Sequence, residues 1–346
     1  QGMIDRESRI EVIATTSSGS IADWGKVKRI EPLFAAAGWT RLNLTALPGQ
    51  VEARARAAEL AADGARVIIS AGGSGTFAAV LEGICDSGVS LDEIRLGFLR
   101  KGSADLIGKV LGMPDEIEAA VSVFTEAIEN DRTLPCDLLR AEVPGLPPKH
   151  FVGYGGAELF GRIPHYTENR AMKWYKGLLS QIFGDLGPFT TGMTLAMIEK
   201  LIKTPFTRAR EWRIRVDGAD AAEGRFQALI VVNGYLGENL AFSDDPLGSG
   251  RFHCFALRNL GARRLLGQAK AARSGAIARD PERWGMEHLV CTNSLELECG
   301  QGFPLNVDGS TLFTPGKAVI RRVGSIPLLA APAQHIPGPP RVIGVN

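Results

Sequence analysis

A glycine-rich turn, Gly72-Gly-Ser-Gly-Thr76, is the stretch of this chain that points most directly to chemistry. Before it lies an apolar, β-branched run that predicts a buried strand. After it, Phe77, Val80, Leu81 and Ile84 have the spacing of the buried stripe of a helix. Glycine lets backbone N–H groups approach an anion closely, and a helix N-terminus adds partial positive charge. The turn therefore predicts a phosphate site, with a tight turn that binds nothing as the alternative.

A second polar loop, Thr15-Thr-Ser-Ser-Gly-Ser20, follows a predicted strand at residues 9–15. Ligands of open parallel sheets bind at the carboxyl ends of the strands, so we expect this loop to form another wall of a nucleotide site. The alternative is a polar loop without a ligand. The Thr76 hydroxyl would either touch phosphate or cap the helix. The candidate nucleotide-binding residues of the two loops are Thr15, Ser17, Ser18, Gly19, Gly72, Gly73, Ser74, Gly75 and Thr76.

Two aspartates stand in turns that could aim a carboxylate into the same crevice. Asp105 ends a Lys-Gly-Ser-Ala-Asp turn after a predicted strand at residues 94–99, and Asp308 precedes Gly309 near a strand end. Phosphoryl transfer needs positioned phosphates, a divalent metal and a base beside the acceptor hydroxyl. These carboxylates could supply the base or a metal ligand. The alternatives are a helix cap for Asp105 and an Asp-Gly hairpin turn for Asp308.

Histidine and cysteine give no metal-binding pattern. The five histidines show no metal-ligand spacing, so we expect structural roles for His150, His165, His253, His288 and His335. The five cysteines include no Cys-x-x-Cys pair. They predict buried side chains in a reducing compartment rather than a zinc site or a disulfide framework.

Composition narrows the class of protein. The 346 residues carry a net charge of +1, with 45% hydrophobic and 22% charged residues, as in ordinary soluble globular proteins. The near-neutral charge gives no reason to expect nucleic acid as a partner. No apolar run predicts a membrane span or a secretory signal, so we expect a cytoplasmic protein.

The order of predicted elements divides the chain. Strand and helix patterns alternate over residues 9–138, which predicts an α/β domain with a mostly parallel sheet at residues 3–139. From about residue 140, strand-like runs dominate, and they predict a β-rich sandwich domain at residues 140–331. Asp137, at the junction, could bridge the two parts. The proline-rich residues 332–346 are expected to form a flexible tail.

Four motifs resemble, in order, those of the diacylglycerol kinase catalytic fold, a superfamily of lipid and sphingoid kinases related to NAD kinases. Residues 15–20 stand where the family has an Asn-Pro-x-Ser-Gly nucleotide loop, and residues 72–76 where it has Gly-Gly-Asp-Gly-Thr. Leu99-Arg-Lys-Gly-Ser-Ala-Asp105 stands in the place of Pro-x-Gly-Thr-x-Asn-Asp. Asn306-Val-Asp-Gly309 is similar to the family's Val-Asp-Gly-Glu. The resemblance extends over residues 9–330.

Two segments, Gly102-Ser103-x-Asp105 and Phe151-Val-Gly-Tyr-Gly155, are most similar to the ceramide kinase branch. The resemblance implies ATP and Mg²⁺ as cofactors and adds Gly102 and Ser103 to the nucleotide site. It also implies that an acidic residue near Glu158 holds the substrate hydroxyl. The catalytic candidates are therefore Asp105, Asp308 and Glu158.

The chain departs from the family at positions that matter for catalysis. Ser74, Leu106 and Ser310 replace three acidic residues of the family motifs. Ser249-Gly-Arg-Phe-His253 stands where many relatives have Asp-Gly-x-Leu-Asp, which holds a structural metal in bacterial diacylglycerol kinases. We therefore expect that structural metal site to be absent, and the sequence leaves the ligands of a catalytic metal open.

These observations favour an ATP-dependent lipid kinase, with ceramide the preferred acceptor and diacylglycerol the next. The alternatives are a catalytically impaired nucleotide- or lipid-binding protein of the same fold and a kinase for a non-lipid alcohol. Apolar helical stretches at residues 171–183 and 194–203 predict peripheral contact with the inner face of the membrane. Their basic flank consists of Lys200, Lys203, Arg208 and Arg210. The oligomeric state is open.

Overall fold

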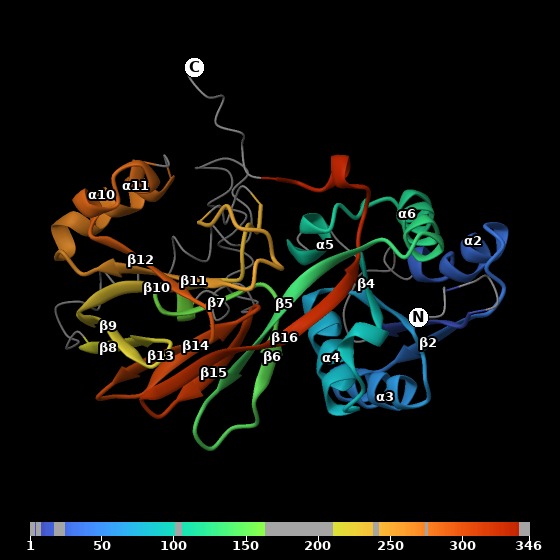
Figure 1. The fold of residues 1–346 in the computed structure, drawn as a ribbon, viewed down its shortest axis with the longest axis horizontal. Helices are drawn as coiled ribbons and strands as arrows, with labels where there is room; N and C mark the ends of the chain where they lie inside the picture. The colour runs from blue at the N-terminus through green and yellow to red at the C-terminus, as the bar shows by residue number, and fades with distance from the viewer. Residues whose placement is uncertain are drawn as a thin grey trace.

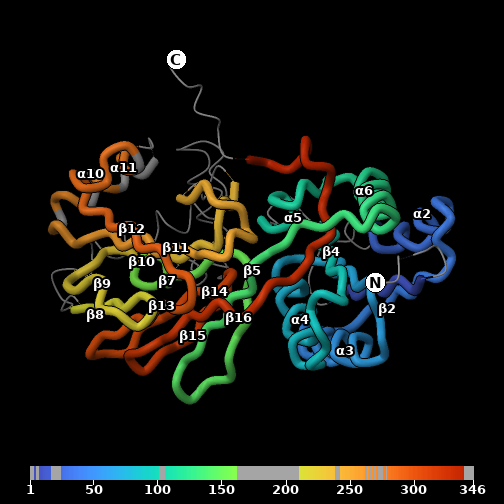
Figure 2. The backbone as a smooth tube through the Cα atoms, viewed as in Figure 1, coloured from blue at the N-terminus to red at the C-terminus, as the bar shows by residue number. Residues whose placement is uncertain are grey.

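Two β-sheets and the helices around them form the molecule (Figure 1). The computed structural model describes residue 4 and residues 8–16, 25–100, 106–162, 210–237, 242–273 and 276–338. Strands of the N-terminal part pair in parallel, whereas strands of the C-terminal part pair antiparallel. The backbone trace in Figure 2 shows the two parts side by side, with long strands running between them.

The parallel strands have the order β2-β1-β3-β4. Each is rich in β-branched or other apolar residues, and β1 and β3 are buried along their whole length because helices cover both faces. The strands are β1 (Ile10–Thr15), β2 (Leu42–Leu47), β3 (Val67–Gly72) and β4 (Arg95–Arg100).

Helices α3 and α4 lie together on one face of this sheet, and α2 and α6 on the other (Figure 1). The stripe predicted after the glycine turn is confirmed, since Phe77, Val80, Leu81 and Ile84 are all buried. The helices are α2 (Ile30–Ala36), α3 (Gln50–Ala62), α4 (Ser74–Asp86), α5 (Leu106–Val110) and α6 (Ile117–Glu129).

The C-terminal part is an antiparallel sandwich, as the run of strand patterns predicts. One layer is the six-stranded sheet β12-β11-β10-β7-β14-β15, and the facing layer contains β16, β13, β8 and β9. Between the layers lies an apolar core that includes Trp212, Leu229, Phe252 and Leu295. The strands are β7 (Tyr154–Glu158), β8 (Trp212–Val216), β9 (Ala219–Gly224), β10 (Phe226–Val232), β11 (Phe252–Arg258), β12 (Met286–Cys291), β13 (Ser294–Cys299), β14 (Phe303–Val307) and β15 (Ser310–Thr314). Helices α10 (Ala262–Arg273) and α11 (Ala276–Arg279) join β11 to β12.

Two long strands connect the parts. β5 (Thr133–Glu142) and β16 (Lys317–Leu329) pair antiparallel over almost their whole length, and β6 (Lys149–Phe151) adds to β5. At its far end β16 pairs in parallel with β4 through Leu328 and Leu96. The last long strand of the chain therefore completes the sheet that the first strands begin, and the domain limits given above remain a prediction.

Several element boundaries differ from the predicted ones. The strand expected at residues 9–15 begins at Ile10, and the strand expected at residues 94–99 runs from Arg95 to Arg100. The apolar stretches at residues 171–183 and 194–203 lie outside the described residues. None of the helices in the described ranges combines the length and apolar character needed to span a bilayer.

Candidate active site

The glycine turn lies at the point where the strand order of the parallel sheet reverses. The chain passes from β1 outward to β2 and then returns to the other side of β1 to form β3. Connections that leave β1 and β3 on opposite sides open a crevice at the carboxyl edge, where open α/β sheets bind their ligands. Thr15 ends β1 and Gly72 ends β3, so both predicted loops begin at this edge.

A hydroxyl pair joins the two sides of this crevice. Thr15 Oγ1 and Thr76 Oγ1 are 2.7 Å apart, and both residues are buried. The Thr76 hydroxyl is thus not the helix cap considered above, because Gly73 is the N-cap of α4 and no side chain caps it. The bond fixes the glycine turn against the end of β1 and leaves the first N–H groups of α4 to point outward.

The space around each glycine shows which side of the turn is open. A Cβ on Gly72 would lie 2.6 Å from Thr76 Oγ1, and one on Gly75 would lie 2.3 Å from Gln50 Nε2. A Cβ on Gly73 would have nothing within 4 Å, and its φ of −87° suits any residue. The open side at Gly73 and the N-terminus of α4 together leave room for an anion beside unpaired backbone N–H groups. The Ser74 side chain is exposed there, and a lone hydroxyl cannot replace a carboxylate as a base.

Asp308 lies in the hairpin turn between β14 and β15 and also holds a neighbouring loop. Its carboxylate accepts hydrogen bonds from the backbone N–H groups of Val152, Gly153 and Tyr154, at 3.2, 3.3 and 2.7 Å. Its φ of 45° and that of 88° at Gly309 form the expected Asp-Gly turn. Burial raises the pKa of this carboxyl, and the three hydrogen bonds oppose that effect.

The loop that Asp308 holds connects the two parts of the molecule. A Cβ on Gly153 would lie 2.4 Å from Asp308 Oδ1 and 3.1 Å from Ile107 Cδ1 of α5. Helix α5, which follows the third motif in the sequence, therefore approaches the fourth motif at Gly153. Helix α4 reaches the same region, since Glu82 accepts a hydrogen bond from the backbone N–H of His150 at 2.5 Å. These contacts place residues 150–154, part of which Asp308 holds, against α4 and α5.

Asn233, which sequence reasoning missed, orders the centre of this region. It is fully buried, and its Nδ2 donates to the carbonyl oxygens of Asp137, at 2.6 Å, and Val152, at 2.9 Å. Its backbone N–H donates to the Gly153 carbonyl at 3.0 Å. The only signal in the sequence was an asparagine placed directly after the apolar run at residues 228–232. Asp137 joins the parts as expected, because its carboxylate accepts from the Gly250 N–H at 2.6 Å and faces Arg322 at 3.6 Å.

Glu158 is tied to other side chains at the end of β7. Its carboxylate accepts a hydrogen bond from Trp212 Nε1 at 3.0 Å and pairs with Arg210 at 3.4 Å. The residue is 6% exposed and has a φ of 60°. Arg210 therefore faces the protein interior at Glu158 rather than a membrane surface.

The described residues do not form a metal site of their own. Within the described ranges, no group of three or more His, Cys, Asp or Glu side chains could hold an ion. We therefore derive no catalytic step through Mg²⁺.

Part of the predicted site falls outside the described residues, namely Ser17, Ser18, Gly19, Gly102, Ser103 and Asp105. The carboxyl ends of β1 and β4, from which their loops leave, flank β3 and its glycine turn on either side. The remaining candidates are Thr15, Gly72, Gly73, Ser74, Gly75 and Thr76 at the carboxyl edge of the parallel sheet, Asp308 in the turn between β14 and β15, and Glu158 at the end of β7.

Comparison with known families agrees with this arrangement. The family model of the diacylglycerol kinase catalytic domain matches residues 9–140. Over this segment the chain is similar to the diacylglycerol kinase catalytic domain. A search of curated proteins gave no match.

Two solved structures from Bacillus anthracis show the same fold over nearly the whole chain. A Bacillus anthracis strain Sterne protein with the provisional name diacylglycerol kinase is similar at a TM-score of 0.67 and 17% identity, over 94% of this chain and 97% of that one. A diacylglycerol kinase structure from the same strain gives 0.60 and 18%, over 94% and 98%. An NAD kinase from Archaeoglobus fulgidus, solved with ATP, gives 0.49 and 12%, over 94% and 95%. The match to the family model thus covers the parallel sheet, and the similarity to the B. anthracis structures extends over the sandwich as well.

Proposed function

We propose that this chain is an ATP-dependent lipid kinase that transfers the γ-phosphoryl group of ATP to a lipid hydroxyl. The observation that carries the proposal is the glycine turn at the strand-order reversal, open at Gly73 and braced by the bond between Thr15 and Thr76. In this proposal the N–H groups at the start of α4 hold the phosphates. Mg²⁺ would arrive bound to the nucleotide, as is usual for an ion that takes few protein ligands.

In the reaction, the lipid hydroxyl oxygen forms a bond to the γ-phosphorus while the bond from that phosphorus to the bridging oxygen of ADP breaks. The hydroxyl proton passes to a carboxylate. Of the described residues, Asp308 is the best-placed acceptor because its loop approaches α5 and its raised pKa favours proton uptake. Asp105 is the second candidate, and we assign Glu158 a supporting role because Arg210 and Trp212 occupy its oxygens.

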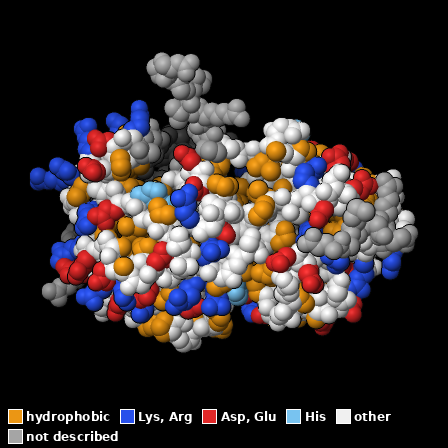
Figure 3. Space-filling view, in the orientation of Figure 1, with side chains coloured by type: hydrophobic (Ala, Val, Ile, Leu, Met, Phe, Trp, Pro, Cys, Tyr) orange, Lys and Arg blue, Asp and Glu red, His pale blue; other side chains and the backbone are white. Residues whose placement is uncertain are grey.

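Ceramide is the proposed acceptor, with diacylglycerol next, on the strength of the two segments that resemble ceramide kinases. We further propose that residues 171–203, together with Lys200, Lys203 and Arg208, bring the enzyme to the inner face of the membrane from the cytoplasm; Arg210 is left out because it pairs with Glu158. Figure 3 shows basic and acidic side chains interspersed on the face seen there, so that face offers no single-sign patch.

The second candidate function is a nucleotide- or lipid-binding protein that has lost transfer. The observation in its favour is the serine at position 74 and at position 310, together with the hydrogen bonds that engage Asp308 and Glu158. Incubation of the protein with labelled ATP and ceramide, sphingosine, diacylglycerol or undecaprenol separates the two. Labelled lipid supports the kinase, and tight ATP binding without labelled lipid supports the alternative.

The nucleotide site itself is tested by Gly73→Val. The new side chain occupies the open space in which phosphate is proposed to lie, so ATP affinity should fall at least tenfold while the fold survives. Gly300→Val is the matched control, because a Cβ there also has nothing within 4 Å and the residue lies between β13 and β14. Unchanged ATP affinity in Gly73→Val would remove the assignment.

A further inference from the structure

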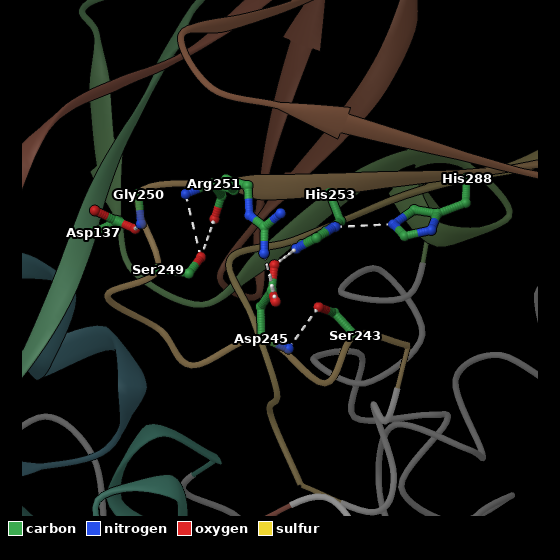
Figure 4. A network of polar contacts seen from close by, with 8 residues as sticks. All are labelled: Asp137, Ser243, Asp245, Ser249, Gly250, Arg251, His253 and His288. Carbon is green, nitrogen blue, oxygen red and sulfur yellow. Dashed lines mark hydrogen bonds and ion pairs between the residues drawn. The ribbon is translucent and has the colours of Figure 1, made fainter.

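A hydrogen-bonded chain of three side chains lies on the outer face of the six-stranded sheet (Figure 4). Asp245 Oδ2 is 2.9 Å from His253 Nε2, and His253 Nδ1 is 2.9 Å from His288 Nε2. Arg251 donates to the other oxygen of Asp245 at 2.9 Å. We call Asp245, His253 and His288 the relay. His253 and His288 are 35 residues apart and are brought together by the pairing of β11 with β12, whereas Asp245 lies in the segment that precedes β11.

The order of the relay fixes the proton on each ring. A carboxylate paired with Arg251 accepts hydrogen bonds only, so His253 must donate from Nε2 and its Nδ1 becomes an acceptor. His288 must then donate from Nε2, which leaves a lone pair on its Nδ1. Burial lowers the pKa of both histidines, in keeping with neutral rings. The relay therefore ends in a hydrogen-bond acceptor of defined direction.

The end of the relay is accessible and lies on an aromatic surface. His253 is 3% exposed, whereas His288 is exposed and stacks on Phe255 at 4.4 Å and 9°. Phe242 extends this surface, with its ring 5.5 Å from that of Phe255. No polar group in the described ranges contacts His288 Nδ1. The acceptor atom thus stands beside an apolar surface, an environment suited to the polar end of an otherwise apolar molecule.

The relay shares its face of the sheet with the proposed reaction centre. Val232 pairs with Tyr154 on one side and His253 on the other, and paired residues point to the same face. Tyr154 and His253 are therefore two strands apart, which is about 10 Å. Tyr154 belongs to the loop that Asp308 holds.

We infer that His288 Nδ1 is an acceptor-lipid subsite that receives a hydrogen bond from a second donor group of the lipid, beyond the hydroxyl that is phosphorylated. This inference rests on the proposed kinase function. An N-acyl sphingoid base has an amide N–H and a second hydroxyl close to its primary hydroxyl. Diacylglycerol has one hydroxyl and two esters, and esters only accept. The relay therefore selects an N-acyl sphingoid lipid over diacylglycerol.

The test compares His288→Phe with the unaltered chain on two lipids in detergent micelles, N-hexanoylsphingosine and dihexanoylglycerol. Phenylalanine keeps the stacking on Phe255 and removes the acceptor nitrogen. The KM for N-hexanoylsphingosine should rise roughly tenfold, the effect of one lost hydrogen bond, with the KM values for dihexanoylglycerol and ATP unchanged. Asp245→Asn, which releases the tautomer of His253, should act in the same direction. His335→Phe, the same change at another exposed histidine, should alter neither lipid KM.

An equal KM change for both lipids, or none, would overturn the inference while leaving the kinase proposal standing. If no lipid is phosphorylated, the kinase proposal fails and the subsite is judged by ¹⁵N NMR of the histidine rings. The His288 Nδ1 resonance should then move on addition of N-hexanoylsphingosine micelles and stay in place with dihexanoylglycerol micelles. Identical spectra with both lipids would overturn the subsite as well.

Discussion

Two aspartates occupy the same kind of hairpin turn, yet their pKa values are shifted in opposite directions. Asp308 and Asp217 each precede a glycine in a hairpin turn, with φ of 45° and 51°, and each accepts three backbone N–H groups. Burial raises the pKa of Asp308 above its ordinary value. Desolvation also raises the pKa of Asp217, but this residue is exposed, and its four hydrogen bonds together outweigh that effect and lower the pKa to about 2. Burial therefore makes Asp308 the better proton acceptor.

Asp308→Asn tests that role. Lipid phosphorylation should fall about 100-fold or more, because the amide cannot take the hydroxyl proton. The control is Asp217→Asn, which disturbs an equivalent turn far along the chain and should keep its activity. Ser74→Ala should lose less than tenfold. In the unaltered enzyme, the acid limb of the pH–rate profile should lie at a higher pH than an ordinary aspartate would give, because burial raises the pKa of Asp308. Equal losses in both asparagine variants would mean that Asp308 acts only on the fold.

At the scale of elements, Asp217 ties the turn between β8 and β9 to the turn between β12 and β13. Besides the three N–H groups of residues 292–294, it accepts the Thr292 hydroxyl at 2.8 Å. The folded-state pKa is below the unfolded value of about 4. This contribution to stability is therefore complete above pH 4 and is lost as the pH falls toward 2.

Asp217→Asn should accordingly lower the urea midpoint of unfolding at pH 7. Its difference from the unaltered chain should shrink as the pH falls from 4 toward 2, since protonation removes the same interaction there. Urea titrations across that range provide the measurement. A difference that stays constant with pH would show that the carboxylate charge is not what holds the turns together.

Sequence reasoning predicted the elements that have strong periodicity, and it missed what depends on pairing between distant strands. The buried stripe from Phe77 to Ile84 could be predicted from the sequence because one face of the helix must be buried. The relay could not be predicted from the sequence, since it depends on the register of β11 and β12 that sets His288 beside Phe255. Asn233 was missed for the same reason, because its partners lie on β5 and next to β7. Local physics sets the elements, whereas long-range register sets the site.

At the scale of the molecule, the joint between α4 and β6 links the glycine turn to the sandwich. Glu82 is buried, and its carboxylate accepts the His150 backbone N–H at 2.5 Å and faces His150 Nδ1 at 3.0 Å. Because α4 begins at the proposed phosphate site, this contact sets how the nucleotide half faces the acceptor half. A change at the joint should therefore alter stability and the use of both substrates together.

Glu82→Ala should lower the free energy of unfolding by about 1–3 kcal/mol, the cost of a buried N–H left without its partner. Asp86→Ala, one turn further along α4, is the control. Its ion pair with Arg54 is exposed, and such pairs contribute under about 1 kcal/mol. Urea unfolding measures both. Equal effects would show that the joint is no stronger than a surface contact.

The course of β16 has a consequence for how the protein is made. Ile326, Leu328 and Leu329 belong to the core of the N-terminal half, yet they are synthesised almost 200 residues after that half's last helix. During translation, β4 must wait with an open edge until this strand emerges, and an unpaired apolar edge invites association with other chains. Until nearly the whole length has left the ribosome, the nascent chain of this protein is therefore exposed to aggregation at this edge, unless a chaperone covers it or the remaining strands fold quickly.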